Sequence, residues 1–391
     1  MRMDAIDKQM KDYIANREIA GASLLVRNEN GIVYQNKWGY ANIEAKKPVE
    51  YDTIFRQASL TKPIIAVAIL ILVEQGKLEL DDEINVYIPE FDHLMVCKTT
   101  ETNLAAMNDP AGVDLANLQL EPAKRNVTIR DLLTHSSGLG MGEVGNKLAR
   151  MLSDPSDSLE TRFHKFGSYP ADFEPGDVSG YSGIVGFDLL GRIIEVASGF
   201  TLDRFLQQFL FDPLEMNDTT FHLAEHHRER LAVLYSSEGG ELFVVPDSEG
   251  IEEMILYGPR YCSGGAGLYS TLVDYDRFGQ MLLHEGQYYG RTILRSETVK
   301  RIHQESAYKQ QLEFAPGLRW GLGMSVRQQP EQANSPLTTG SYGWSGAYGT
   351  HFFIDPASKL ETVLMLNVSN IGGAGSHVSK RIEELIAAAY L

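Results

Sequence analysis

Cysteine is scarce in this sequence. Only Cys97 and Cys262 occur among the 391 residues, and they are too far apart to form a C-x-x-C pair. This excludes a disulfide framework and a cysteine-based zinc site, and it is typical of a cytoplasmic protein with reduced thiols. Cys262 is a candidate reactive thiol, but free cysteines more often pack in a core, and packing is the role we expect.

Long hydrophobic runs and excess positive charge are also lacking. The longest apolar run, Pro63 to Val73, is shorter than the roughly 20 residues that cross a bilayer. The first residues, Met1 to Lys8, lack the apolar segment of a signal peptide, so we expect no cleaved leader. A formal net charge of −17 repels phosphate backbones, so nucleic acid is not an expected partner.

The apolar residues follow strand patterns near both ends of the chain and helix patterns between them. The expected strands lie at 20–27, 32–40, 318–326, 347–354 and 360–367. The expected helices lie at 3–17, 59–76, 187–197, 269–283 and 379–390. The polar stretch 98–126 is expected to be a loop. Strands from both termini suggest one antiparallel sheet with a helical part packed beside it, which is an α+β fold.

The strongest chemical signal is the pair Ser59 and Lys62 at the start of the helix expected over 59–76. That helix is apolar on every face, which indicates burial, and residues three apart lie on one side of a helix. A serine hydroxyl becomes nucleophilic when a neighbouring base takes its proton, and a partly desolvated lysine can be that base. The alternative is a helix N-cap serine beside a surface lysine.

The same Ser-x-x-Lys spacing recurs at Ser306 and Lys309, among glutamine and glutamate residues. No apolar helix follows this second pair. We therefore expect a solvated segment without chemistry there.

The segment Arg56-Gln-Ala-Ser-Leu-Thr-Lys62 resembles the active-site motif of penicillin-recognising serine enzymes, which include class C β-lactamases, D-alanyl-D-alanine carboxypeptidases and family VIII carboxylesterases. The resemblance spans roughly residues 10–390, through blocks such as Leu132–Leu139, Gly264–Leu268 and Phe278–Leu282. It implies the β-lactamase/transpeptidase-like fold, an antiparallel sheet with flanking helices plus a helical domain.

We expect residues 1–75 and 262–391 to form an α/β sheet domain and residues 76–261 a mainly helical domain. The resemblance implies an active site in the cleft between the two.

The family's second motif, Tyr-x-Asn, matches at Tyr181, while Gly183 stands where the family usually has Asn. By the resemblance, the Tyr181 hydroxyl passes a proton between nucleophile, leaving group and incoming water. Loss of the Asn amide removes a group that binds a substrate carbonyl, which counts against amide and β-lactam turnover. A plain core tyrosine is the structural alternative.

The third motif takes the form Trp-x-Gly at Trp344, Ser345 and Gly346, which the resemblance assigns to substrate binding on an inner strand. The backbone N–H groups of Ser59 and Ala347 are then the expected oxyanion hole. An indole at position 344 replaces the cation that recognises a carboxylate in β-lactamases, and it favours apolar esters. Plain packing in the sheet is the alternative role for Trp344.

Other constellations are weaker. Gly180-Tyr-Ser-Gly-Ile184 and Gly343-Trp-Ser-Gly-Ala347 lack the final glycine of an α/β-hydrolase elbow. The histidines of 222–227 lack the spacing of a zinc motif. The glycines of 264–267 are not followed by the residues of a phosphate-binding loop.

The sequence thus predicts a serine hydrolase that works through an acyl-Ser59 intermediate, with Lys62 and Tyr181 as catalytic partners, and most simply a carboxylesterase on small or medium esters. The alternatives are a β-lactamase, D-alanyl peptidase, amidase or acyltransferase of the same fold, or a non-catalytic ligand-binding or sensor domain. The expected partner is a small ester or amide substrate, with neither cofactor nor metal.

Overall fold

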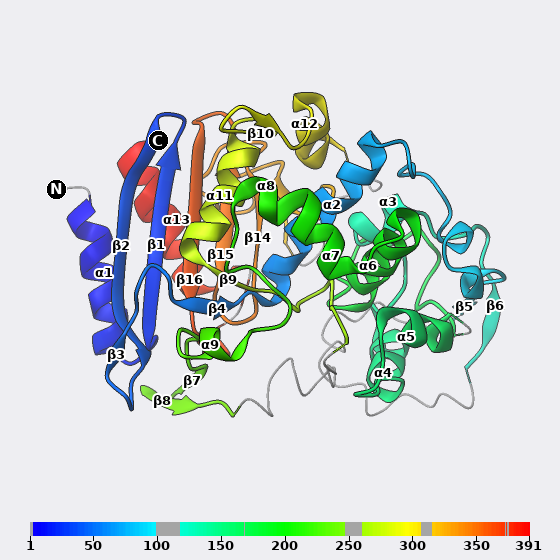
Figure 1. The fold of residues 1–391 in the computed structure, drawn as a ribbon, viewed down its shortest axis with the longest axis horizontal. Coiled ribbons are helices and arrows are strands. Elements are labelled where there is room, and N and C mark those ends of the chain that lie inside the picture. Colours follow the sequence, from blue (N-terminus) through cyan, green and yellow to red (C-terminus); the bar gives the residue numbers. More distant parts are fainter. Residues whose placement is uncertain are drawn as a thin grey trace.

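The computed structural model describes residues 3–98, 118–167, 169–246, 260–305, 315–371, 373 and 375–391 (Figure 1). Its largest element is an eight-stranded sheet in the order β12-β13-β14-β15-β16-β1-β2-β3. The N-terminal region supplies β1 (Gly21–Asn28), β2 (Gly31–Asn42) and β3 (Lys47–Pro48). The C-terminal region supplies β12 (Leu318–Trp320), β13 (Ser325–Arg327), β14 (Tyr342–Ser345), β15 (His351–Asp355) and β16 (Leu360–Leu366).

All neighbouring strands of this sheet pair antiparallel. The two ends of the chain meet where β16 pairs with β1, from Ala22 opposite Leu366 to Asn28 opposite Leu360. Most side chains of both strands are buried, because helices cover both faces of the sheet. The predicted antiparallel sheet built from both termini, with its flanking helices, is confirmed.

One face of the sheet is covered by α1 (Met3–Ala15) and α13 (His377–Tyr390), which lie side by side in Figure 1. Ile6 and Ile382 from these two helices share a core cluster with Phe353 of β15. Side chains alternate between the faces of a strand, so the neighbours of Phe353 point to the opposite side. Because β14 pairs with β15, the same alternation puts Trp344 and Ser345 on opposite faces of the sheet.

The helix α2 (Thr61–Glu74) lies at the centre of the larger core, and every residue from Thr61 to Leu72 is buried. α6 (Val185–Ser198) packs against it. The helix expected over 59–76 is confirmed, except that Ser59 lies in a short 3-10 turn, η1 (Ala58–Leu60), and does not cap α2. An apolar helix of this kind is stable only where other elements enclose it.

The other helices surround these central elements. They are α3 (Ile129–Leu133), α4 (Glu143–Met151), α5 (Leu159–Phe166), α7 (Leu202–Leu206), α8 (Asp212–Leu214), α9 (Glu225–Arg228), α11 (Leu272–Leu283) and α12 (Ser296–Gln304). A π-helical turn, Gln207–Phe211, joins α7 to α8, and two 3-10 turns lie at Ile84–Val86 and Pro89–Phe91. No helix among the described residues is long and apolar enough to span a membrane.

Several short strands form smaller sheets. These are β4 (Ile54–Arg56) with β9 (Tyr269–Thr271), β5 (Met95–Cys97) with β6 (Leu120–Pro122), β7 (Tyr235–Glu238) with β8 (Glu241–Val244) and β17 (Val368–Ser369), and β10 (Gln287–Tyr288) with β11 (Arg291–Thr292). The pair β4–β9 lies directly before the turn that carries Ser59.

Four sequence expectations need correction. The single strand expected over 318–326 is wrong, because the chain turns at Gly321–Gly323 and forms the hairpin β12–β13. The strand expected over 347–354 begins only at His351, after a turn, and the helix expected over 269–283 begins at Leu272, since 269–271 is β9. Within the loop expected at 98–126, residues 120–122 form β6, and 99–117 lie outside the described residues. The pair Ser306 and Lys309 also lies outside them.

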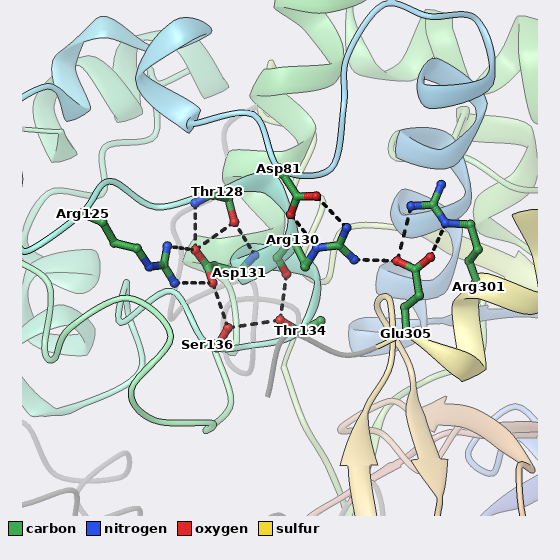
Figure 2. A network of polar contacts seen from close by, with 9 residues as sticks. All are labelled: Asp81, Arg125, Thr128, Arg130, Asp131, Thr134, Ser136, Arg301 and Glu305. Carbon is green, nitrogen blue, oxygen red and sulfur yellow. Dashed lines mark hydrogen bonds and ion pairs between the residues drawn. The ribbon is translucent and has the colours of Figure 1, made fainter. Parts of the chain in front are cut away.

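A polar network connects α3 to α12 (Figure 2). The Arg130 guanidinium of α3 pairs with Asp81 at 2.7 Å and with Glu305 at 2.5 Å, and Glu305 also pairs with Arg301 of α12. Shared charge pairs in a network hold geometry better than isolated surface pairs do. The beginning of the helical part is thereby fixed to a helix of the C-terminal region.

A buried carboxyl group lies between the sheet and α11. Glu361 of β16 is fully buried, and neither of its oxygens has a hydrogen-bond partner among the described residues. Gly279 of α11 packs on it, because any side chain at position 279 would overlap the Glu361 carboxyl. Burial, followed by the nearby charge of Asp276, raises the pKa of Glu361 well above its usual range. Arg27 Nε lies 3.8 Å from one Glu361 oxygen and acts in the opposite direction, so the net effect is that the folded protein binds a proton at Glu361 more tightly than the unfolded chain does.

The substitution Glu361→Gln should remove this proton uptake. The stability that depends on protonated Glu361 is present at low pH and is lost as the pH rises toward the raised pKa of the folded state. From about pH 5 to about pH 8, the melting temperature of the variant should rise relative to the wild type by about 2 °C or more. The control Glu297→Gln alters an exposed carboxylate on α12 and should show no such trend. Parallel pH trends for all three proteins would contradict the assignment.

Candidate active site

Ser59 lies in the η1 turn between β4 and α2. The residue before it, Ala58, has a left-handed backbone with φ of +47°, which costs a residue other than glycine about 1 kcal/mol. The flanking Gln57 holds this conformation, because its N–H donates to Leu268 O at 2.9 Å and its carbonyl accepts from Thr350 Oγ1 at 3.2 Å. Local strain held by surrounding contacts is common at functional sites.

The Lys62 amine is buried, with 0% of the residue exposed. Nζ lies 3.2 Å from Ser59 Oγ and donates to Gly183 O at 2.6 Å and to Gly265 O at 2.8 Å. Nζ also lies 5.0 Å from the centre of the Tyr181 ring. The two carbonyls compensate the amine for its loss of water. As the sequence predicts, one helical turn brings Lys62 to Ser59.

The loop that carries the Gly265 carbonyl is fixed by a buried carboxylate. Asp188 of α6 accepts hydrogen bonds from Gly265 N–H at 2.9 Å, Ser263 Oγ at 2.6 Å and Tyr261 OH at 2.5 Å. Burial raises the pKa of Asp188, although these hydrogen bonds act in the opposite direction. The position of one oxygen beside Lys62 thus depends on a side chain that does not itself contact Lys62.

Tyr181, which lies shortly before α6, also reaches Ser59. Its hydroxyl donates to Ser59 Oγ at 2.7 Å and accepts from Trp344 Nε1 at 3.3 Å. The Tyr181 ring stacks on Trp320, with 5.7 Å between centroids and 15° between planes. Trp320 in turn donates from Nε1 to Gly180 O at 2.7 Å, directly before Tyr181. Aromatic walls therefore surround the hydroxyl groups of the site and reduce their contact with water.

Gly346 lies directly after β14 and touches the turn that carries Ser59. A side chain at position 346 would overlap the carbonyl oxygen of Gln57, so only glycine allows this approach. Ala347, the next residue, is consequently placed beside the turn. Neither the Ser59 N–H nor the Ala347 N–H has a hydrogen-bond partner among the described residues. Two free N–H groups beside a serine hydroxyl are what an oxyanion hole requires.

Ser345 points to the opposite face of β14 from Trp344. Its Oγ lies 2.7 Å from His351 Nδ1, and His351 Nε2 lies 2.9 Å from Glu383 of α13. These residues line a pocket on the α13 side of the strand, to which Trp344 also contributes. The structure does not bring the Ser345 hydroxyl into a hydrogen bond with Ser59, and its part in substrate binding stays a prediction.

Sequence reasoning missed three residues that shape the site: His135, Trp320 and Gly265. The only signals were the blocks Leu132–Leu139 and Gly264–Leu268, which contain two of them. These residues shape the site through the face of an aromatic ring or through a backbone carbonyl. The spacing of residues along a sequence reveals neither. Trp320 lay inside the stretch interpreted as a single strand.

In the described part of the chain, neither a cluster of metal ligands nor a reactive thiol lies beside these residues. Among the parts of the chain that the structure describes, no three His, Cys, Asp or Glu side chains gather as metal ligands. Cys262 is buried, lies 3.5 Å from His222 Nε2, and burial raises the pKa of its thiol. The expectation that Cys262 packs in the core is confirmed.

The sheet, the helices around α2 and the Ser-x-x-Lys turn define a β-lactamase-like protein. Residues 6–384 match the Beta-lactamase family, and the chain belongs to that family. Esterase EstB of Burkholderia gladioli is 30% identical to it over 397 residues, which cover 96% of this chain and 92% of that protein.

Two further similarities agree. Lovastatin esterase of Penicillium rubens is 27% identical over 91% of this chain and 90% of its own length. The solved structure of EstCE1, described as a hydrolase with promiscuous acyltransferase activity, has a TM-score of 0.80 at 24% identity and covers 99% of this chain and 98% of its own. That structural likeness shows the β-lactamase/transpeptidase fold.

Two glycines of the site allow a matched test of backbone packing. Gly346→Ala should lower the free energy of unfolding by about 1–3 kcal/mol, because the new methyl group forces β14 away from the Ser59 turn. Gly183→Ala is the control, since a methyl group there meets nothing within 4 Å and should change stability by less than about 0.5 kcal/mol. Urea unfolding measures both. Equal stability of the two variants would contradict the close approach of Gly346.

Proposed function

We propose that this chain is a serine hydrolase, most simply a carboxylesterase, in which Ser59 forms the acyl intermediate. The observation that carries the proposal is the convergence of two proton-transfer groups on one hydroxyl, with Tyr181 OH at 2.7 Å and Lys62 Nζ at 3.2 Å from Ser59 Oγ. A serine that only capped the N-terminus of a helix would need neither proton-transfer group beside its hydroxyl. Similarity to two esterases along nearly the whole chain supports an ester substrate.

In the acylation step, Ser59 Oγ attacks the ester carbonyl carbon while its proton leaves to Lys62 or Tyr181. A neutral Lys62 amine has two N–H bonds for the carbonyls of Gly183 and Gly265, which leaves its lone pair for the Ser59 proton. Tyr181 contacts the same oxygen and offers a second route. Because both groups contact the same hydroxyl, either one can take its proton as Oγ attacks.

The remaining steps use the same few groups. In this proposal, the N–H groups of Ser59 and Ala347 stabilise the negative oxygen of the tetrahedral intermediate. Tyr181 then gives a proton to the leaving alcohol, so that the C–O bond of the ester breaks and the acyl group stays on Ser59. Water then attacks this acyl group while it gives a proton to the same pair. The bond between Ser59 Oγ and the acyl carbon breaks, and the pair returns a proton to Oγ, which regenerates Ser59.

Positions 183 and 344 support esters over β-lactams. Gly183 leaves open space beside its backbone where the family usually has Asn, since a Cβ atom there would meet nothing within 4 Å. The indole of Trp344 contacts Tyr181 and adds no charge that would attract a substrate carboxylate. An apolar wall of this kind favours uncharged acyl or alcohol groups.

Ser59→Ala should abolish turnover of short-chain p-nitrophenyl esters, by about 10⁴-fold or more, because it removes the oxygen that attacks the ester carbon. Ser306→Ala has the same Ser-x-x-Lys spacing and is the matched control, with activity expected near the wild type. A fluorophosphonate probe followed by peptide mass mapping should place the adduct on Ser59. Ester turnover by folded Ser59→Ala would refute the proposal, and a folded wild type without turnover or adduct would indicate a binding domain.

A parallel assay of p-nitrophenyl esters, a chromogenic cephalosporin and D-alanyl peptides tests the substrate class. Esters should have the highest kcat/KM, by about tenfold or more, because the Asn amide is missing and Trp344 is uncharged. Gly183→Asn fits the open space and should raise cephalosporin turnover relative to ester turnover by about threefold. Faster turnover of the cephalosporin than of every ester by the wild type would instead assign a β-lactamase.

A further inference from the structure

His135 lies directly beneath Tyr181 and takes no part in the steps above. It follows α3, is fully buried, and has a left-handed backbone with φ of +51°. The centre of its ring lies 4.9 Å from the Tyr181 ring, 4.2 Å from Trp320 and 5.2 Å from Phe187. The imidazole therefore packs against the Tyr181 ring.

His135 accepts two hydrogen bonds, and they fix the residues on either side of Tyr181. Its carbonyl accepts from Gly180 N–H at 3.0 Å, and its Nδ1 accepts from Ser182 N–H at 3.1 Å. Since Gly183 follows Ser182, the same contact also fixes the carbonyl that receives Lys62 at 2.6 Å. One residue thus controls the approach of both proton-transfer groups to Ser59.

The hydrogen-bond pattern also assigns the protonation of this ring. Nδ1 accepts a hydrogen bond, so the proton of the neutral imidazole lies on Nε2. Burial, followed by the charge of Lys62, holds the pKa of His135 well below its usual range. Nε2 is buried without a hydrogen-bond partner among the described residues. A buried unpaired N–H costs free energy, which an apolar side chain of similar size would avoid.

The turn around His135 is held from both sides by the network of Figure 2. Thr134 Oγ1 donates to the Arg130 carbonyl at 2.8 Å, and Ser136 N–H donates to the Asp131 carbonyl at 2.8 Å. The Asp131 carboxylate closes a capping box with Thr128 and binds Arg125 at 2.6 Å. These contacts allow the left-handed conformation that turns the His135 ring under Tyr181.

We propose that His135 is a positioning residue, whose Nδ1 and carbonyl set the place of the Tyr181 hydroxyl at Ser59 and of the Gly183 carbonyl at Lys62. The proposal rests on the proposed function, because His135 acts only through Tyr181 and Lys62. It follows that an acceptor at the Nδ1 position matters, and that the rest of the ring matters less.

Two substitutions test the hydrogen-bond acceptor of the His135 side chain while both allow the left-handed backbone at this position. His135→Asn places an amide oxygen at the position of Nδ1, and asparagine tolerates a left-handed backbone. His135→Gly tolerates the same backbone but has no acceptor. With p-nitrophenyl esters, kcat of the Asn variant should stay within about fivefold of the wild type, while kcat of the Gly variant should fall about 10- to 100-fold with KM changed less than about threefold.

A double-mutant cycle with Tyr181→Phe tests whether His135 acts through Tyr181. In the Tyr181→Phe background, His135→Gly should reduce kcat by a clearly smaller factor than in the wild-type background, because one of the two groups that it positions is already missing and only the effect through Lys62 remains. A loss as large as in the wild-type background would overturn the proposal, since a general structural defect would add to the loss at Tyr181.

Folding and function are checked separately. Thermal melting confirms that each variant is folded, and His135→Ala replaces His135→Gly if the latter does not fold, because it also removes the acceptor. Wild-type activity of the folded variant without the acceptor, or a loss in His135→Asn as large as in Tyr181→Phe, would overturn the proposal for His135 alone. Ester turnover by Ser59→Ala would instead overturn the proposed function itself.

Discussion

The burial of the Lys62 amine is the constraint on which the arrangement of this site depends. An amine without water needs oxygen partners, and α2, which surrounds it with apolar side chains, offers none. The partners come from two distant segments, as the carbonyls of Gly183 and Gly265. Both segments must therefore be fixed to within a fraction of an ångström. Asp188 fixes one and His135 the other, so the buried titratable groups around the site support the lysine.

The aromatic side chains set the polarity of the site. Tyr181, Trp320 and Trp344 contact one another, with centroid distances of 4.6–5.7 Å. Their rings help to bury the Lys62 amine, and the low polarity around it strengthens its hydrogen bonds. An added cation near Lys62 would be costly in such surroundings. The indole of Trp344 carries no charge and donates one hydrogen bond to Tyr181.

Local patterns predicted the site better than they predicted its surroundings. Ser59 and Lys62 are one helical turn apart, so their contact follows from the sequence alone. Tyr181 is 122 positions from Ser59 and was found only through a family motif. The carbonyl of Gly265 and the ring of His135 leave no trace in spacing or composition, because any residue has a carbonyl and a buried ring looks like core packing. The sheet was predictable from its apolar alternation, but the turn within 318–326 was not.

The turn before α2 shows why such a site needs support from several elements. Ala58 has a strained left-handed backbone, and without support from its surroundings the turn would relax. That outcome is blocked because the neighbouring Gln57 is bound at both its N–H and its carbonyl, from Leu268 and Thr350. Gly346 packs against the same carbonyl and leaves no room for movement. The Ser59 N–H, which has no partner among the described residues, is thus held in place by the bonds of Gln57 and by the packing of Gly346.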